Sequence, residues 1–496
     1  MLNIMITFIV CILLLIAGFF VYGKFIDRFF GADPVRKTPA YTKPDGVDFI
    51  PLPAWKIFMI QFLNIAGLGP IFGAVLGAMY GPVAYIWIVT GCIFMGAVHD
   101  YFSGMLSLRN GGASLPEIVG KYLGATIKGF LRIFTLLLLI FVGVAFVTGP
   151  AKLLQTITSL DTSIWLYLIF AYYLLATLLP INKIIGRIYP LFGASLLIMA
   201  LGVGGSILFQ SASGELHLQE INGSSFSNFH LDPGTNILFP MLFIIISCGA
   251  ISGFHATQSP LMARCLKNEK QGRSIFFGAM ISEGIVAIIW ATAAMNYFGD
   301  VHGLNYTLSN PLSTSPDIIP DPAWVVNEIC NSWLGKTGAI FAIVGVIACP
   351  ITSGDTAFRS ARLTIADMLG IEQAGIRSRL LVSIPIFLTG FLLTFILKDE
   401  FGRIWKFVGI SNQSLATIVL WSAAMYLALK KKNHWLISIP ATFLTTVCIT
   451  YILVAPNKGA GFALSLPVGY SIGIAGGLII LGLFLYTAKE KGSAKI

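Results

Sequence analysis

The sequence predicts an all-α polytopic membrane protein, and three observations lead to this class. Hydrophobic residues make up 56% of the 496 residues, and charged residues make up only 11%, against about 25% in soluble domains. Apolar runs of roughly 18 to 25 residues recur along the chain, and each is long enough to cross a bilayer as a helix. The mean hydropathy of +0.83 agrees with them. This composition excludes a water-soluble globular protein.

About thirteen apolar runs have the length of a transmembrane helix. We expect the first to be a retained span and not a cleaved signal peptide, because no basic residue precedes it and no A-x-A site follows. The expected spans are residues 3–23, 57–79, 83–108, 130–149, 163–180, 188–209, 236–258, 275–297, 337–358, 381–397, 404–429, 434–455 and 466–487.

Basic residues between the spans predict the orientation. With the N-terminus outside and the C-terminus inside, the cytoplasmic segments hold 26 of the 32 Lys and Arg residues, as the positive-inside rule requires. The outside segments 210–234 and 299–335 contain none. Because the net charge of +10 is spread over these short clusters, we expect a bilayer and no nucleic acid as partner. The seven cysteines form no CxxC pair, so their spacing predicts neither a disulfide framework nor a zinc site.

Two spans are interrupted by small residues. The second contains Ala66-Gly67-Leu68-Gly69-Pro70, and the seventh contains the sequence GAISG at 249–253. Five spans separate the two starts, so the two halves would face opposite ways, which is typical of secondary transporters with inverted repeats and broken helices. The alternative is that glycine is simply common in membrane helices.

Several motifs resemble the carbon starvation protein A family. They are GPIFG at 69–73, GAVHD at 96–100, SLRNGGASL at 107–115, CGAISGFH at 248–255 and SGDTA at 353–357, with Arg359, Arg362, Asn412 and Gln413 extending the match from about residue 55 to 430. The resemblance implies a bacterial inner-membrane uptake system of the amino acid–polyamine–organocation superfamily. It also implies a leucine-transporter-type fold with an inverted five-plus-five repeat, and uptake of pyruvate or of peptides.

The expected organisation follows from the spans and this repeat. It comprises residues 1–54 as an extra N-terminal helix and cytoplasmic linker, 55–209 as the first repeat, 210–234 as an extracytoplasmic loop, 235–430 as the second repeat, and 431–496 as two C-terminal helices with a short tail.

The helix breaks are the expected substrate site. An interrupted helix frees backbone amides and carbonyls, and the N-terminus of its second half attracts a carboxylate. Close packing through small residues is the alternative reading of the same glycines. The predicted substrate-binding residues are Gly67, Gly69, Pro70, Ser252, Gly253, His255, Asn412 and Gln413.

Buried ionisable residues are the expected coupling groups. Of the six histidines, only His99 and His255 fall inside predicted spans and away from the span ends, where charged groups are costly and face a cavity or a partner. As sequence neighbours, His99 and Asp100 are expected to meet different helices. Asp100 would orient or neutralise a cation, and His255 would meet substrate or a proton. A structural hydrogen-bonding role is the alternative for both histidines. Hydrogen bonding between helices also accounts for Glu283, Asn412 and Gln413, with a functional role as their alternative.

A hydroxyl and carboxylate group ends the ninth span. In the implied fold, Thr352 and Ser353 meet carbonyls freed in the second span, which would suit Na⁺. Asp355 equally allows a proton, so the coupling ion is expected to be H⁺ or Na⁺. Alternatively, Asp355 pairs with Arg359 at i+4.

No enzyme signature is present: the sequence lacks HExxH, and Gly120-Lys121-Tyr122 does not complete a phosphate loop. We therefore expect no cofactor and no catalysis. The leading hypothesis is a cation-coupled symporter that imports a small carboxylate such as pyruvate by alternating access. A peptide transporter is the alternative, and a ligand-binding channel or sensor is a third hypothesis. The sequence does not predict the oligomeric state.

Overall fold

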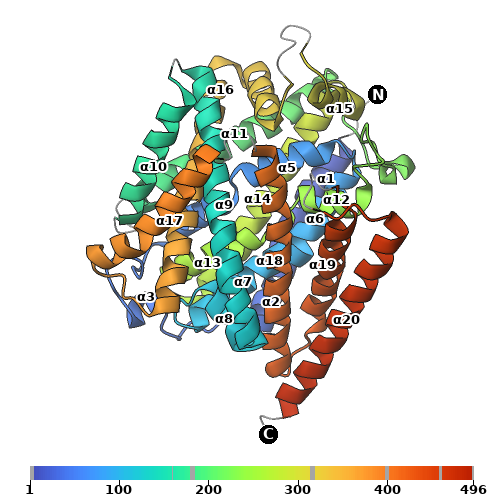
Figure 1. Ribbon diagram of the computed structural model, residues 1–496. Coiled ribbons are helices and arrows are strands. Elements are labelled where there is room, and N and C mark those ends of the chain that lie inside the picture. Colours follow the sequence, from blue (N-terminus) through green and yellow to red (C-terminus); the bar gives the residue numbers. More distant parts are fainter. Residues whose placement is uncertain are drawn as a thin grey trace.

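The computed structural model describes residues 5–158, 160–178, 185–312, 319–396, 401–456 and 461–493. Within these ranges the regular elements are helices that pack into one elongated bundle (Figure 1). The start of the span expected at 3–23 and the ends of the spans expected at 163–180 and 381–397 lie outside the described residues. The two termini lie at opposite ends of the bundle, which is what an odd number of crossings requires.

The first half of the chain begins with α1 and continues to α11. The bounds are α1 Ile6–Ala17, α2 Gly23–Phe30, α3 Pro39–Thr42, α4 Ala54–Ile65, α5 Leu68–Ala78, α6 Val83–Gly91, α7 Ala97–Arg109, α8 Leu115–Leu123, α9 Ala125–Ile157, α10 Thr162–Leu178 and α11 Ile185–Ser213.

The second half follows a polar connection and includes the longest helix, α16. The bounds are α12 Leu238–Ile245, α13 Gly253–Ala263, α14 Gly278–Tyr297, α15 Val301–Ser309, α16 Pro322–Leu369, α17 Ile376–Ile396, α18 Phe401–Leu429, α19 Trp435–Val454 and α20 Leu466–Ser493. Helix α16 is kinked at Gly335, whose φ of 63° suits glycine.

Nine helical segments in the described ranges are long and apolar enough to span a membrane, and the bent pair α4 and α5 makes a tenth. The other predicted spans also fall on helices. The span expected at 163–180 is the shorter helix α10, the span at 236–258 is divided between α12 and α13, and the span at 337–358 lies inside α16. The total of thirteen crossings and the inverted repeat stay predictions.

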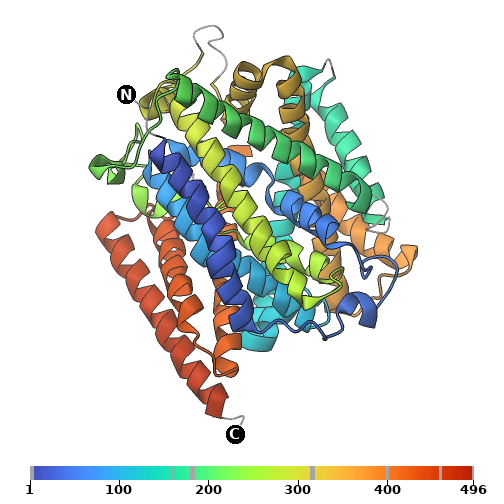
Figure 2. The same ribbon diagram turned by 180° about the vertical axis from the view of Figure 1, so that it is seen from behind.

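Long helices surround the two interrupted ones. Helix α16 packs against α9 and α11, α5 packs against α14, and α13 packs against α7 and α18. Helices α1 and α14 run side by side on the face seen in Figure 2. Helices α19 and α20 form a pair at one edge of the bundle (Figure 1). Apolar side chains such as Leu478 and Leu483 of α20 are exposed, as a surface in contact with lipid tails requires.

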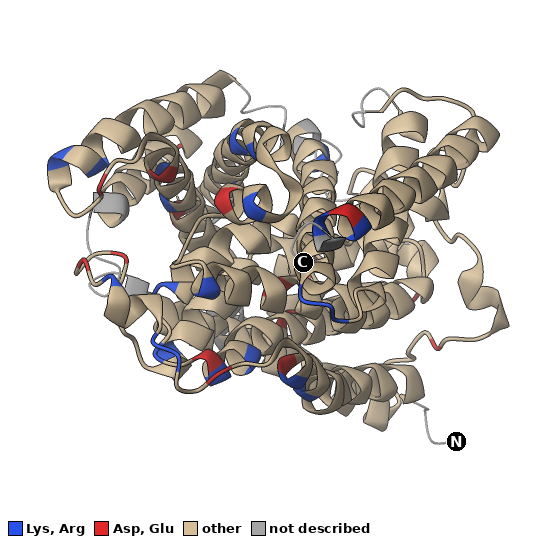
Figure 3. Ribbon diagram, turned by 90° about the horizontal axis from the view of Figure 1, so that it is seen from below, with Lys and Arg blue, Asp and Glu red and all other residues tan. Residues whose placement is uncertain are grey.

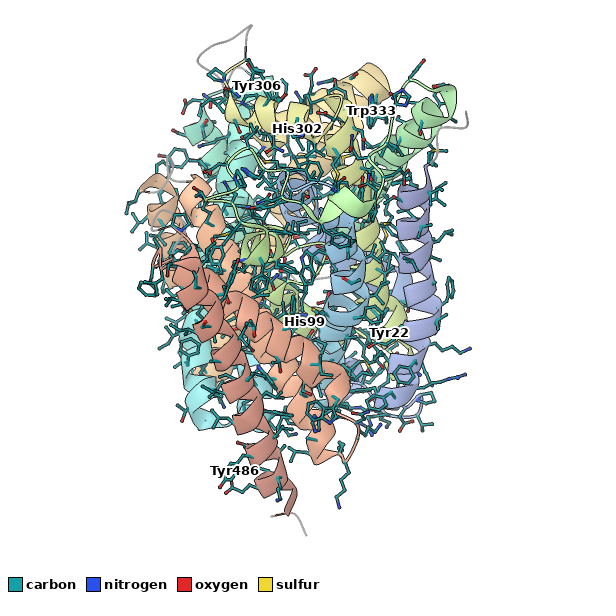
Figure 4. All side chains as sticks on the ribbon, turned by 90° about the vertical axis from the view of Figure 1, so that its right-hand side faces the viewer. Tyr22, His99, His302, Tyr306, Trp333 and Tyr486 are labelled. Atoms are coloured by element: carbon teal, nitrogen blue, oxygen red, sulfur yellow. The ribbon has the colours of Figure 1, made fainter. Side chains whose placement is uncertain are left out.

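Charged residues lie at the end of the bundle that carries the C-terminus. Seen from this end, Lys and Arg residues are spread over several helix ends and connecting segments (Figure 3). The opposite end carries His302, Tyr306 and Trp333, and His99 lies near mid-height between the two ends (Figure 4). The buried His99 is therefore far from both ends of the bundle.

Candidate functional site

The first predicted helix break is present between α4 and α5. Ala66 and Gly67 leave the helical conformation, and the two helices meet at an angle of 45°. The break releases carbonyl groups from their helical partners. Ser353 Oγ of α16 donates to Leu63 O at 3.3 Å and to Asn64 O at 3.2 Å. The Ser353 hydroxyl of α16 and the freed carbonyls of α4 therefore meet, which is what the implied fold led us to expect of Ser353 but not what the structure shows for Thr352.

The second predicted break is also present, between α12 and α13. Residues 246–252 are not helical, and Gly249 has a φ of 88°, which favours glycine. The Gly249 amide donates to Glu283 Oε1 at 3.0 Å. Ser252 precedes α13, and its buried hydroxyl has no hydrogen-bond partner among the described residues. The carboxylate of α14 therefore supports the backbone of this break.

The two breaks touch each other. A Cβ atom built on Gly69 would lie 2.3 Å from both Cβ and Sγ of Cys248, so only glycine fits there. A Cβ atom on Gly96, which ends the π-helical turn between α6 and α7, would lie 2.2 Å from Ala250 O. Glycines thus bring α5 and α7 directly against the second break.

A cavity of about 550 Å³ adjoins the two breaks. Gly69, Cys248 and Asn412 are among its lining residues at the breaks. Its walls are largely apolar and aromatic, and it extends to the segments that precede α12 and α16. Further lining residues include Phe72, Phe146, Phe254, Trp405, His230, Asn236, Leu308, Asp321 and Lys406. The arrangement can hold an organic solute between the two broken helices.

A fully buried cluster of histidines and carboxylates lies next to the second break. His99 Nδ1 lies 2.8 Å from Asp100 Oδ1, and His255 Nδ1 lies 3.0 Å from Asp100 Oδ2. His255 Nε2 lies 3.5 Å from Glu283 Oε2. Helices α7, α13 and α14 therefore share one network of ionisable groups.

The expectation that His99 and Asp100 meet different helices is wrong for His99. The carboxylate of Asp100 has two oxygens, and one of them turns back to the neighbouring imidazole while the other reaches α13. Backbone periodicity places the Cβ atoms of neighbours on different faces, but it does not constrain the ends of branched side chains.

The residues at 352–355 form a second polar group. Ser353 faces the first break, whereas the Thr352 hydroxyl donates to Cys349 O of its own helix at 2.8 Å. Asp355 Oδ2 accepts a hydrogen bond of 2.5 Å from the Tyr189 hydroxyl of α11. The Arg359 guanidinium, one turn farther along α16, lies 3.0 Å from Asp48.

Of the remaining predicted binding residues, Asn412 lines the cavity, whereas Gln413, Gly253, Gly67 and Pro70 do not. Asn412 of α18 lines the cavity, and its Oδ1 has no hydrogen-bond partner in the described parts of the chain. Gln413 points elsewhere, since its amide donates to Phe243 O of α12 at 2.7 Å. Gly253 packs against α18, because a Cβ atom there would lie 2.4 Å from Asn412 O. Gly67 and Pro70 lie at the first break without lining the cavity.

An ion-pair cluster that the sequence analysis missed lies farther along α16. Asp48, in the segment before α4, lies 3.0 Å from Arg359 and 3.0 Å from Arg362, and all three are buried. Burial alone would raise the pKa of Asp48, but the guanidinium groups of Arg362 and Arg359 hold it well below its ordinary value. No motif marks Asp48, because its partners are more than 300 residues away. From the sequence, Glu283 is assigned to hydrogen bonding between helices, and Cys248 is named only as part of a motif.

The relatives of this chain include a membrane protein and two transporters. An uncharacterized membrane protein of Haemophilus influenzae is 45% identical over 350 residues, covering 62% of this chain and 94% of that protein. The peptide transporter CstA of Escherichia coli is 25% identical and covers 89% of this chain and 79% of its own. The pyruvate/proton symporter BtsT of the same organism is 27% identical, with 85% and 77% covered.

Solved structures with a similar fold are also transporters. A manganese transporter of Eremococcus coleocola aligns with a TM-score of 0.57 at 15% identity, covering 90% of this chain and 99% of its own. A Na⁺-coupled sialic acid symporter aligns with a TM-score of 0.54 at 12% identity, covering 95% and 97%. The molecule is therefore a multi-pass membrane protein whose fold these transporters share. The family model for carbon starvation protein CstA matches residues 3–156, 135–310 and 322–451, so the chain belongs to the CstA family.

Proposed function

We propose that this chain is a secondary active importer that moves a small carboxylate, such as pyruvate, by cation-coupled alternating access. The observation that carries the proposal is the cavity between two interrupted helices that touch at Gly69 and Cys248. Interrupted helices present free backbone groups near the middle of a membrane, where a solute and an ion can bind and from which either side can be reached.

The two ends of α16 support an alternating mechanism. Pro322, at its start, lines the cavity. Ser353 lies at the first break, and Arg359 lies six residues or about 9 Å farther along the same helix. Arg359 and Arg362 both form ion pairs with Asp48. We propose that these ion pairs close the passage on the side away from the cavity and separate when the transporter opens there.

The orientation follows from the basic residues. We propose that the N-terminus lies outside and the C-terminus inside, with thirteen crossings and two inverted repeats of five helices each. The cavity would then open to the outside, through the segments 210–234 and 299–335 that contain no Lys or Arg. The Asp48 cluster would lie toward the cytoplasm.

Peptide uptake is the second candidate function, and the size of the cavity favours it. Pockets of about 300–1,000 Å³ hold drug-sized ligands, and the cavity of about 550 Å³ falls in that range. Its lining includes one ammonium group, Lys406, and one carboxylate, Asp321. Such a pair would suit the two charged ends of a short peptide, whereas pyruvate needs only the cation.

The coupling ion is proposed to be H⁺ or Na⁺. Ser353 beside the freed carbonyls of Leu63 and Asn64 offers oxygen ligands to Na⁺, with Thr352 next to it. The ionisable network of His99, Asp100 and His255, and the carboxyl group of Asp355, are the places where a proton would bind. The proton symporter among the relatives supports the second option.

Uptake into proteoliposomes tests the proposal. The purified chain is reconstituted, and accumulation of labelled pyruvate and of a labelled dipeptide is measured with a proton gradient alone and with a sodium gradient alone. We expect one gradient to drive one substrate above its equilibrium level. Uptake that only equilibrates under both gradients would indicate a channel, and no uptake of either substrate would contradict the proposed substrate classes.

A further inference from the structure

Three side chains of the types that commonly bind metal ions lie close together between the cavity and the buried network. They are Cys248 in the segment before α13, His255 in the first turn of α13, and Glu283 in α14. One ligand atom from each lies within 4.8 Å of the ligand atoms of the other two. His255 and Glu283 are fully buried, whereas Cys248 is half-buried and lines the cavity.

Two of the three ligand atoms have no hydrogen-bond partner among the described residues. They are His255 Nε2 and Glu283 Oε2, both in side chains with no exposed surface. Their separation of 3.5 Å is long for a hydrogen bond. It is close to the ~3.4 Å that separates two tetrahedral zinc ligands whose bonds are about 2.0–2.1 Å long. The spacing of these two atoms therefore fits a metal ion bound by both of them.

Groups around the three side chains orient them toward this gap. Asp100 Oδ2 lies 3.0 Å from His255 Nδ1, so that a proton on Nδ1 leaves the lone pair of Nε2 free. The Gly249 amide donates to Glu283 Oε1 and leaves Oε2 free. A carboxylate that holds the far nitrogen of a histidine is the usual outer partner of a metal-bound histidine.

From this geometry we infer that Cys248, His255 and Glu283 form a binding site for a thiophilic divalent cation of the zinc class. A thiolate, an imidazole and a carboxylate favour zinc-like ions and disfavour Mg²⁺ and Ca²⁺. Cys248 lies on the cavity wall and gives the ion a path of entry. Binding releases the proton of the Cys248 thiol and needs no other reactant.

An ion at this site would inhibit transport. It would tie the non-helical segment before α13 to α14, and alternating access requires the broken helices to move against their neighbours. This consequence rests on the proposed function, whereas ion binding itself does not. No sequence motif marks the site, because its ligands are spread over residues 248–283 without the short spacings of zinc motifs.

Titration with Co²⁺ tests the site, because Co²⁺ adopts zinc geometry and absorbs light strongly when a thiolate binds it. The purified full chain, carrying no polyhistidine tag, should bind one equivalent and show a thiolate-to-cobalt absorption band. Cys248→Ser should abolish the band. Cys448→Ser is the matched control, since Cys448 is a buried cysteine in α19 near Thr417 and should keep it. Glu283→Gln should weaken Co²⁺ binding at least about tenfold, and Asp100→Asn by roughly 10- to 100-fold.

The inference is overturned if wild type binds no stoichiometric Co²⁺, or if the band persists in Cys248→Ser. Size-exclusion profiles and unfolding temperatures show whether each variant is folded. If Cys248→Ser does not fold, the weakened Co²⁺ binding of Glu283→Gln is the test instead. In a separate arm, micromolar Zn²⁺ should reduce uptake by wild type and by Cys448→Ser at least tenfold, whereas uptake by Cys248→Ser should stay at that variant's own zinc-free rate, whatever that rate is. Cobalt binding without this inhibition removes the inhibitory role, while absent uptake in every sample contradicts the proposed function and leaves the metal site standing.

Discussion

Gly69→Ala tests whether the two helix breaks are in contact. The added Cβ would lie 2.3 Å from Cβ and Sγ of Cys248, where ordinary contacts begin at 3.4 Å. The two segments would have to separate by roughly 1 Å. One of the clashing atoms is a Cβ that moves only with the backbone, so a change of rotamer cannot relieve the contact.

The expected cost is that of overpacking a tight interior, about 1–3 kcal/mol. Cys248→Gly removes both clashing atoms, so the double variant should recover part of the lost stability, with a coupling energy of about 0.5–3 kcal/mol. Gly205→Ala is the matched control in α11, because a Cβ atom there meets nothing within 4 Å. It should be neutral or stabilising by up to about 1 kcal/mol.

Thermal unfolding in detergent, followed by tryptophan fluorescence, measures the stability of the four variants, and proteoliposome uptake measures their activity. Gly69→Ala should unfold at a lower temperature and lose transport while still inserting into membranes. If it matches Gly205→Ala in both assays, or if Cys248→Gly restores nothing, the two breaks do not meet and the site is wrong.

The other predictions concern closure, coupling and orientation. Asp48→Asn should destabilise the protein by about 3–5 kcal/mol because it removes a buried carboxylate from two arginines. The pKa of Asp48 is lowered in the folded state, so its contribution to stability is present above about pH 4 and is lost as the pH falls further. The thermal unfolding temperature, measured from pH 7 to 3, should therefore depend less on pH in the variant than in wild type. If Na⁺ drives uptake, Thr352→Ala and Ser353→Ala should raise the Na⁺ concentration for half-maximal uptake. If H⁺ drives it, Asp355→Asn should keep substrate exchange but lose pH-driven accumulation; unchanged accumulation in all three would place coupling elsewhere. A cysteine at Lys267 should react with an impermeant reagent only from the cytoplasmic side, and labelling from outside would reverse the proposed orientation.

The helix breaks could be predicted because they depend on local sequence. The small residues around Gly67 and Gly249 disfavour a continuous helix wherever the chain folds, and the structure interrupts the helices at those places. The apolar runs likewise predicted helices, since the bilayer leaves few other structures. The number of crossings could not be fixed in this way, because α12 and α13 are each shorter than a span.

The partners of the polar residues could not be predicted from one sequence. Glu283 is an isolated carboxylate in an apolar run, and nothing nearby in the chain indicates that it faces His255 and Cys248. Asp48 lies in a polar segment that sequence alone does not place, yet it is buried against Arg359 and Arg362. These contacts depend on how α13, α14 and α16 pack, which is a property of the whole bundle.

Labelling of Cys248 tests alternating access most directly. Cys248 lines the cavity and is half-buried, while the other six cysteines are buried, so an impermeant thiol reagent followed by mass spectrometry reports on this one position in the natural chain. We expect labelling from the outside in the absence of a gradient, protection by the transported substrate, and labelling from the cytoplasmic side when conditions favour the opposite state. Equal and simultaneous labelling from both sides would indicate a channel and contradict the account.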